Sequence, residues 1–194
     1  MKNRKTETHP AIFLDRDGVI TKDVGFPHKL SDLHLMLNVA AGIAKMKQLG
    51  CLVFVITNQS GVARGMFSLK EVSLFHEHMQ SQLRVSNPAA SIDQIYVCPH
   101  HPGGKVDEYS MVCECRKPGT QLVETALSQH DIDVERSFFI GDRLSDIECG
   151  RSMGFTTIQI LGDKYSRIPT ADHHFKDLLE CAGLVERQLL AEES

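Results

Sequence analysis

In the stretch AIFLDRDG (residues 11–18), the acidic residues Asp15 and Asp17 follow a short apolar run. An uninterrupted apolar run of this length is typical of a strand that is buried on both faces. A second run, CLVFVIT at residues 51–57, has the same character and leads into a polar, glycine-bearing turn. In parallel sheets such polar residues gather beyond the carboxyl ends of the strands, where ligands bind.

Outside these two runs, strand and helix patterns alternate along the chain. Short apolar runs predict further strands at residues 92–97, 137–140 and 156–161. Helical spacing predicts helices at residues 39–49, 68–84, 118–129, 147–153 and 175–190. This alternation predicts the α/β class, with residues 1–194 forming a single doubly wound, Rossmann-like domain around a parallel sheet. Residues 98–116 lack periodicity, so we expect a loop there instead of a large cap domain.

Composition and charge exclude several classes of function. The net charge is −4 and no long basic run occurs, which argues against a nucleic-acid partner. No apolar stretch approaches the length of a membrane span. The polar residues 1–10 lack the apolar segment of a signal peptide, which predicts a cytoplasmic protein with reduced thiols. We expect a monomer that acts on a small molecule.

Polar side chains follow the predicted strands at the points where catalysis is expected. Asp15 and Asp17 follow the first strand, Thr57 ends the second, and Asp142 follows the strand at 137–140. Lys117 stands directly before a predicted helix. Asp15 is a candidate nucleophile, Asp17 a candidate general acid and base, and Lys117 a counter-charge for phosphoryl oxygens. Clustered carboxylates also predict a bound Mg²⁺ ion.

Each of these residues also has an ordinary structural interpretation. An aspartate after a strand often caps a turn or a helix, and Asp17-Gly18 is by itself a turn signal. The functional interpretation depends on the combination, because all of these groups fall at one expected edge of a sheet.

The same segments resemble the sequence motifs of the haloacid dehalogenase (HAD) superfamily of phosphatases. The resemblance lies in residues 15–19 (DRDGV), 57–58 (TN), 117–118 (KP) and 141–146 (GDRLSD). It implies hydrolysis through a phosphorylated Asp15. It also implies that Mg²⁺ is held by Asp15, the Asp17 carbonyl and Asp142.

A narrower resemblance is to the heptose 1,7-bisphosphate and histidinol-phosphate phosphatases. It lies in residues 57–65 (TNQSGVARG), 98–102 (CPHHP) and 113–118 (CECRKP). It implies removal of the C7 phosphate of a heptose bisphosphate during synthesis of activated heptose for bacterial surface glycans. Histidinol phosphate or another small phosphate ester is the alternative substrate. The implied substrate contacts are Asp23, Phe26, His28, Thr57, Asn58, Gln59, Ser60, Arg64, Arg116, Lys117 and Arg143.

Two positions depart from the pattern of this subfamily. Arg143 stands where the family usually has lysine, and Phe26-Pro27-His28 replaces a Tyr-Val-His segment. Arginine and lysine differ in how they bind phosphate, so the first departure bears on substrate fit.

Cysteine and histidine residues gather at both ends of the loop at 98–116. Cys98, His100, Cys113 and Cys115 offer three thiolates and one imidazole, a set that suits a structural, tetrahedral Zn²⁺ ion. The family resemblance supports this interpretation, and spacing alone leaves His101 as an alternative to His100. The alternatives are free thiols on a mobile loop, or a zinc-loop binding module whose catalytic site has decayed.

The remaining cysteines and most histidines have no matching ligand partners. Cys51, Cys149 and Cys181 are expected in the core. His76 is expected on a solvated helix face, and residues 173–174 on a surface turn.

Overall fold

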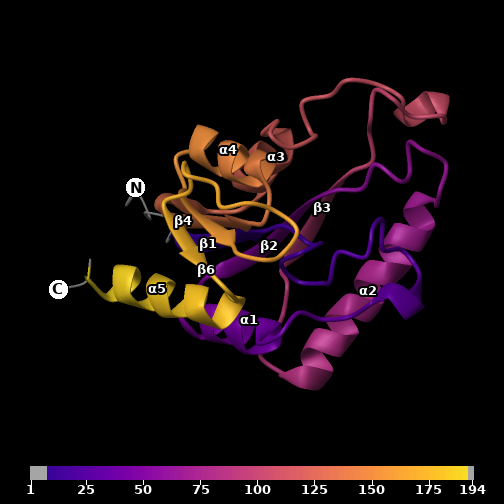
Figure 1. The fold of residues 1–194 in the computed structure, drawn as a ribbon. Coiled ribbons are helices and arrows are strands. Elements are labelled where there is room, and N and C mark those ends of the chain that lie inside the picture. The colour runs from indigo at the N-terminus through magenta and orange to yellow at the C-terminus, as the bar shows by residue number, and fades with distance from the viewer. Residues whose placement is uncertain (1–7, 192–194) are drawn as a thin grey trace, which may run out of the picture.

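The computed structural model describes residues 8–191 and shows an α/β fold (Figure 1). Six strands form one sheet: β1 (His9–Leu14), β2 (Leu52–Asn58), β3 (Gln94–Cys98), β4 (Ile132–Gly141), β5 (Thr156–Ile160) and β6 (His173–Phe175). The α-helices are α1 (Val39–Gln48), α2 (Leu69–Ser86), α3 (Gln121–Gln129), α4 (Leu144–Ser152) and α5 (Leu178–Ala191). Short 3-10 turns lie at Leu30–Asp32 and Asp107–Tyr109.

The sheet is parallel throughout, with the strand order β3-β2-β1-β4-β5-β6. Strand β1 lies at the centre, where Ile12 pairs with Val53 on one side and Phe138 on the other. The order reverses at β1, because the chain runs outward to β3 and then returns to β4 on the other side. Such a switch point opens a crevice at the carboxyl ends of the two central strands.

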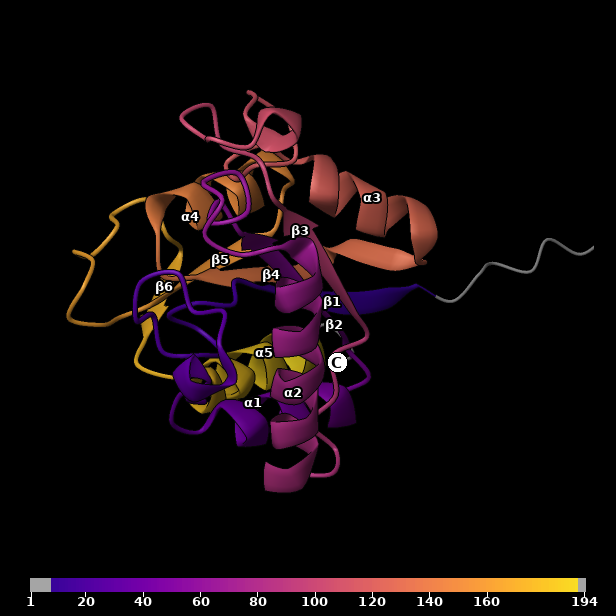
Figure 2. The same ribbon diagram turned by 90° about the vertical axis from the view of Figure 1, so that its right-hand side faces the viewer.

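Helices cover both faces of the sheet: α1, α2 and α5 lie on one face, and α3 and α4 on the other (Figure 2). Successive residues of β1 point to opposite faces, so Ile12 packs in the core beneath the first group of helices and Phe13 in the core beneath the second. Both side chains are fully buried. Two-sided burial explains why these strands read as continuous apolar runs.

The predicted α/β class and parallel sheet are confirmed, but one strand was missed and several element boundaries differ. The helices predicted at residues 147–153 and 175–190 begin at Leu144 and Leu178, and the strand predicted from residue 92 begins at Gln94. Strand β6 was missed, and residues 173–174 lie in it instead of on a surface turn, because a three-residue edge strand carries no apolar run. Strand β4 begins at Ile132 and not at residue 137, since its first half is polar and only half-buried. Helix α3 begins at Gln121 and not at Pro118, which follows a cis peptide bond.

No helix within residues 8–191 is both long enough and apolar enough to cross a membrane. Most of the polar N-terminal stretch, residues 1–7, lies outside the described part of the chain, so the expectation of no signal peptide stays a prediction.

Candidate active site

The carboxyl edge of the sheet brings the motif residues together around one cavity. This cavity has a volume of about 140 Å³. It is lined by Asp15, Asp17, Thr57, Asn58, Arg116, Lys117, Arg143, Ser145 and Asp146. Residues from four separate segments therefore meet at the point where the strand order reverses.

Lys117 is held at the centre of this edge by groups from the end of β1, from β2 and from helix α4. Its Nζ lies 2.8 Å from Oδ1 of Asp15 and 2.7 Å from Oδ1 of Asp146, and it donates to the carbonyl oxygen of Ile56 at 2.6 Å. The backbone of Lys117 is clamped by Asn58, whose side chain accepts from its N–H and donates to its carbonyl. Burial opposes the charge on the lysine, but Asp146 and Asp15 outweigh it and raise the pKa of Lys117.

Three buried carboxylates form a cluster beside the lysine. One oxygen each of Asp15, Asp142 and Asp146 lies within 4.8 Å of the others. Burial and the neighbouring negative charges raise the pKa of Asp15 to about 6 and that of Asp142 to about 8. Oδ1 of Asp142 is buried and, within residues 8–191, accepts no hydrogen bond. Its nearest cation among the described residues is Nε of Arg143 at 3.8 Å. A hard divalent cation would complement both the charge and this oxygen, so the site fits the metal that HAD phosphatases use.

The backbone at Gly18 approaches this cluster closely. Gly18 has φ +91°, and a Cβ placed there would stand 2.0 Å from Oδ2 of Asp142. No residue with a side chain fits, which explains the glycine after Asp17 in physical terms.

Asp17 is surrounded by hydrogen-bond donors. Arg16 donates to Oδ1 through Nε at 2.7 Å and to Oδ2 through Nη2 at 2.8 Å, and the Gln59 amide donates to Oδ2 at 3.2 Å. The same amide donates to Oγ1 of Thr57 at 2.8 Å. Because that oxygen already accepts, the Thr57 hydroxyl hydrogen is available to donate to a ligand in the cavity.

Asp23 and Arg143, two of the predicted substrate contacts, form a charged cluster with Lys164 beside the central cavity; this cluster is called the arm below. Nη2 of Arg143 and Nζ of Lys164 both donate to Oδ2 of Asp23, at 2.8 Å and 2.5 Å. The Arg143 guanidinium also lies 5.0 Å from the centre of the Tyr165 ring. Asp23, Lys164 and Tyr165 line a second cavity of about 290 Å³ that borders Asp142.

Among the other predicted contacts, Arg64 and Arg116 touch the cysteine-rich loop. Arg64 lies 3.1 Å from Nε2 of His101 and 5.8 Å from the centre of the Phe26 ring. His28 stacks on Phe67 with 4.6 Å between ring centres. Ser60 is buried in the turn after β2. Arg116 lines the central cavity and donates weakly to the carbonyl of His100.

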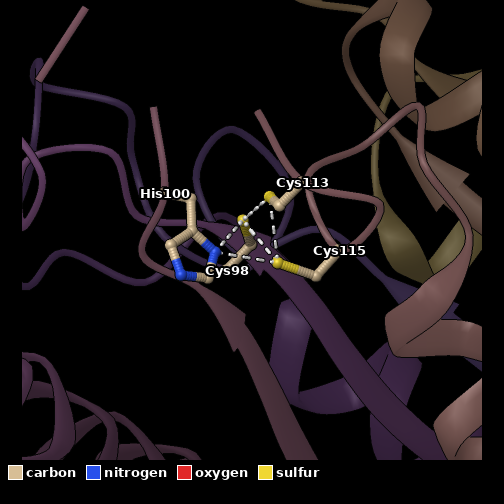
Figure 3. A group of neighbouring side chains, drawn as sticks. All are labelled: Cys98, His100, Cys113 and Cys115. Carbon is tan, nitrogen blue, oxygen red and sulfur yellow. Dashed lines mark hydrogen bonds between the residues drawn. The ribbon is translucent and has the colours of Figure 1, made fainter. Parts of the chain in front are cut away.

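Cys98, His100, Cys113 and Cys115 converge on one point (Figure 3). The three sulfur atoms lie 3.1 to 3.6 Å apart, and Nδ1 of His100 lies 3.2 Å from the sulfur of Cys115. Ligands about 2.3 Å from a tetrahedral zinc ion would be separated by distances of this order. His101 is not part of the group, because its ring contacts Arg64 and the Gly103 N–H.

The charge state of the thiols also fits a cation. Burial raises the pKa of Cys98 and of Cys115, and in Cys115 the neighbouring thiols raise it further. Three thiolates cannot coexist at this spacing without a positive charge among them. A bound zinc ion supplies that charge and favours the ionised ligands.

Two residues of the site were given no role from the sequence. Asp146 belongs to the fourth motif, and its position in the first turn of α4, four residues after Asp142, was the available signal. Arg16 stands between the two motif aspartates and is fully buried. The expectation for His76 is wrong: it is buried, with Nε2 3.1 Å from Nη1 of Arg16.

Comparisons with known proteins agree with this geometry. Residues 114–181 match the family model described as HAD-hydrolase-like. The chain is 41% identical, over 79% of its length and 84% of the relative, to D-glycero-β-D-manno-heptose-1,7-bisphosphate 7-phosphatase of Rhodopseudomonas palustris. The chain belongs to the HAD superfamily of phosphatases. Within this superfamily, the D-glycero-α-D-manno-heptose-1,7-bisphosphate 7-phosphatase of Photorhabdus laumondii is 39% identical over 73% of this chain and 76% of the relative.

A solved HAD structure is similar along almost the whole chain. It is D,D-heptose 1,7-bisphosphate phosphatase of B. bronchiseptica in complex with magnesium and phosphate, with a TM-score of 0.78 and 26% identity. The match covers 92% of this chain and 99% of that one. The chain is therefore a phosphatase, and the alternative of a non-catalytic binding module is set aside.

Proposed function

We propose that this phosphatase removes the C7 phosphate of D-glycero-D-manno-heptose 1,7-bisphosphate, with Mg²⁺, through a phosphorylated Asp15. The observation that carries the proposal is the buried Asp15–Lys117 pair at 2.8 Å, in which Asp15 also belongs to a cluster of three carboxylates. This arrangement supplies a nucleophile, a fixed positive charge and a cation site at one point. The sugar comes from the relatives, which are named as 7-phosphatases of this bisphosphate.

In the first half of the reaction, Asp15 is held by Lys117 through one carboxylate oxygen and attacks phosphorus with the other. The bond between phosphorus and the C7 oxygen breaks, and Asp17 protonates the departing oxygen. Lys117 and the Thr57 hydroxyl stabilise the negative charge on the phosphoryl oxygens.

In the second half, water attacks the phosphorus atom of the aspartyl-phosphate. Asp17 accepts a proton from this water, inorganic phosphate leaves, and Asp15 returns to the carboxylate form. When bound, Mg²⁺ would be held by Asp15, Asp142 and the Asp17 carbonyl, and Asp146 lies close enough to contribute. The cation would neutralise phosphoryl charge and relieve the repulsion among the carboxylates.

The loop from Cys98 to Cys115 has a structural role in this proposal. A zinc ion bound by the four ligands would fix the backbone directly before Arg116 and Lys117. Arg116, Arg64 and the arm of Asp23 and Arg143 would then contact the remainder of the bisphosphate. Phe26, His28, Asn58, Gln59 and Ser60 would shape the surrounding surface.

The test is phosphate release with Mg²⁺ over a panel of substrates: both anomers of heptose 1,7-bisphosphate, fructose 1,6-bisphosphate and histidinol phosphate. We expect the highest kcat/KM with one heptose anomer, and no turnover with folded Asp15→Asn. Equal or better turnover of histidinol phosphate would reject the heptose assignment while retaining the phosphatase. An active Asp15→Asn variant would reject the covalent mechanism.

A further inference from the structure

A chain of buried polar side chains connects helix α2 with the reaction centre. His76 lies on α2, Arg16 follows β1, and the two are sixty residues apart in sequence. Both are buried, and Arg16 has no exposed surface at all. A fully buried arginine is rare and is expected only where every part of it has a partner.

Each part of the Arg16 guanidinium does have a partner. Nε and Nη2 donate to the two oxygens of Asp17, and Nη2 also reaches the carbonyl of Pro27 and Oε1 of Gln59, both at 3.0 Å. The guanidinium carbon lies 4.7 Å from the centre of the Phe75 ring. Nη1 is turned the other way, toward Nε2 of His76 at 3.1 Å.

The chemistry of the two groups fixes the state of His76. A guanidinium can only donate hydrogen bonds, so Nε2 of the imidazole must accept, and the ring proton must lie on Nδ1. Burial, together with the charge of Arg16, lowers the pKa of His76 to about 3, which keeps the ring neutral. His76 is therefore a fixed acceptor that holds the far edge of the guanidinium.

The orientation of Gln59 is fixed in the same way. Its Oε1 faces Arg16, which has no acceptor, so its Nε2 must point toward Asp17 and Thr57. Thr21 adds a further donor to Oδ1 of Asp17 at 3.1 Å. Arg16, Gln59 and Thr21 all donate to the Asp17 carboxylate, which fixes the positions of both of its oxygens.

We propose that His76 and Arg16 are positioning residues that hold the Asp17 side chain where it can accept the proton of the attacking water in the second half of the reaction. This rests on the proposed function, because it assumes that Asp15 becomes phosphorylated. In that step a water oxygen bonds to phosphorus, the bond from phosphorus to Asp15 breaks, and the water proton passes to Asp17. The proton then goes to the departing oxygen of the next substrate molecule, so no other reactant is needed.

The consequence is that disturbing His76 slows release of phosphate from Asp15 more than it slows phosphorylation. p-Nitrophenyl phosphate separates the two steps, because p-nitrophenolate departs without needing a proton from Asp17. In His76→Leu we expect kcat to fall about tenfold, a part of the 10²–10⁴-fold that general acid–base groups contribute. Phosphorylation should stay fast, which gives a burst of p-nitrophenolate followed by slow turnover.

The experiment combines stopped-flow absorbance with mass spectrometry of acid-quenched protein. We expect the phosphorylated fraction in the steady state to rise several-fold in His76→Leu over the unchanged chain. His76→Gln, which can present an acceptor near the position of Nε2, should restore most of the rate. His78→Leu is the matched control, since His78 lies on the same helix but is exposed.

Two outcomes would overturn the proposal. One is a fall in kcat with no rise in the phosphorylated fraction, which indicates a general structural defect. The other is His76→Gln behaving like His76→Leu. Should His76→Leu fail to fold, Arg16→Lys replaces it in the experiment. The lysine retains the positive charge but loses the paired contact with Asp17. An unchanged phosphorylated fraction in Arg16→Lys would also contradict the proposal. Failure of the proposed function is distinct, because the unchanged chain would then show no phosphorylated Asp15.

Discussion

Nζ of Lys117 lies 2.8 Å from Oδ1 of Asp15 and 2.7 Å from Oδ1 of Asp146, with all three side chains almost fully buried. One ammonium is thus shared between the proposed nucleophile and a carboxylate of α4. The positive charge compensates the two carboxylates, and in the proposed reaction it would also stabilise the phosphoryl oxygens.

Replacing this ammonium should cost both activity and stability. We expect Lys117→Met to lower kcat at least about 10²-fold, because a buried charge next to the phosphoryl group is lost. The free energy of unfolding should fall by about 3 kcal/mol at pH 8, where Asp15 and Asp146 would face each other without a counter-charge. Urea unfolding and steady-state kinetics measure the two effects. Lys176→Met, at an exposed position, is the control; activity within tenfold of the unchanged chain would contradict the assigned role.

Without a divalent cation, the stability of the protein should decrease as pH rises from about 4 to 8. The pKa of Asp15 is raised from 3.8 to about 6 and that of Asp142 from 3.8 to about 8. A raised pKa in the folded state means that the protonated group stabilises the fold below pH 4, and that this contribution is lost as the pH passes 6 and 8. Thermal unfolding in EDTA at several pH values measures this loss of stability.

Mg²⁺ should reverse that trend, because it binds the ionised carboxylates. We expect Mg²⁺ to raise Tm more at pH 8 than at pH 5. Asp142→Asn should flatten the pH dependence of the metal-free protein and weaken the effect of Mg²⁺. An Mg²⁺ effect of unchanged size in this variant would argue against Asp142 as a ligand.

Removing zinc should affect substrate binding more than the chemical step. Cys113→Ser should lose about one bound zinc per chain, measured by elemental analysis. KM should rise because Arg116 follows the last candidate zinc ligand directly, whereas Lys117 is also held by Asn58, Asp15 and Asp146. Cys51→Ala is the control, since Cys51 is buried away from the loop. A zinc-free chain with unchanged thermal stability and unchanged KM would mean that the loop needs no metal.

The arm formed by Asp23, Arg143 and Lys164 should govern KM. Asp23→Asn removes the charge that orients both cations, so we expect KM to rise up to about tenfold while kcat changes less than about twofold. The two cations are about half exposed, so the change in unfolding free energy should stay below about 1 kcal/mol. Lys45→Met breaks an ion pair with Glu186 on the helical face and should leave KM unchanged. An equal rise of KM in Asp23→Asn and Lys45→Met would contradict a role of the arm in substrate binding.

The sequence by itself determined the fold class and indicated most of the proposed catalytic groups. Apolar runs and helical spacing are local patterns, and they predict an alternating α/β chain without knowledge of its contacts. Because parallel strands end at one edge, Asp15, Thr57 and Asp142 could be placed together from their positions after strands. The cysteine and histidine ligands were recognisable because both pairs lie close in sequence.

Only the tertiary structure decided which distant side chains complete the site. Asp146 pairs with Lys117, and His76 holds Arg16, through contacts between segments that no local pattern connects. His76 reads as one of several polar residues on an amphipathic helix until packing places it against a buried guanidinium. His100 was separated from His101 only by their contacts, since the His100 ring lies against the sulfur of Cys115 and the His101 ring against Arg64. These choices depend on burial and on hydrogen-bond partners, which the chain acquires only when the helices pack onto the sheet.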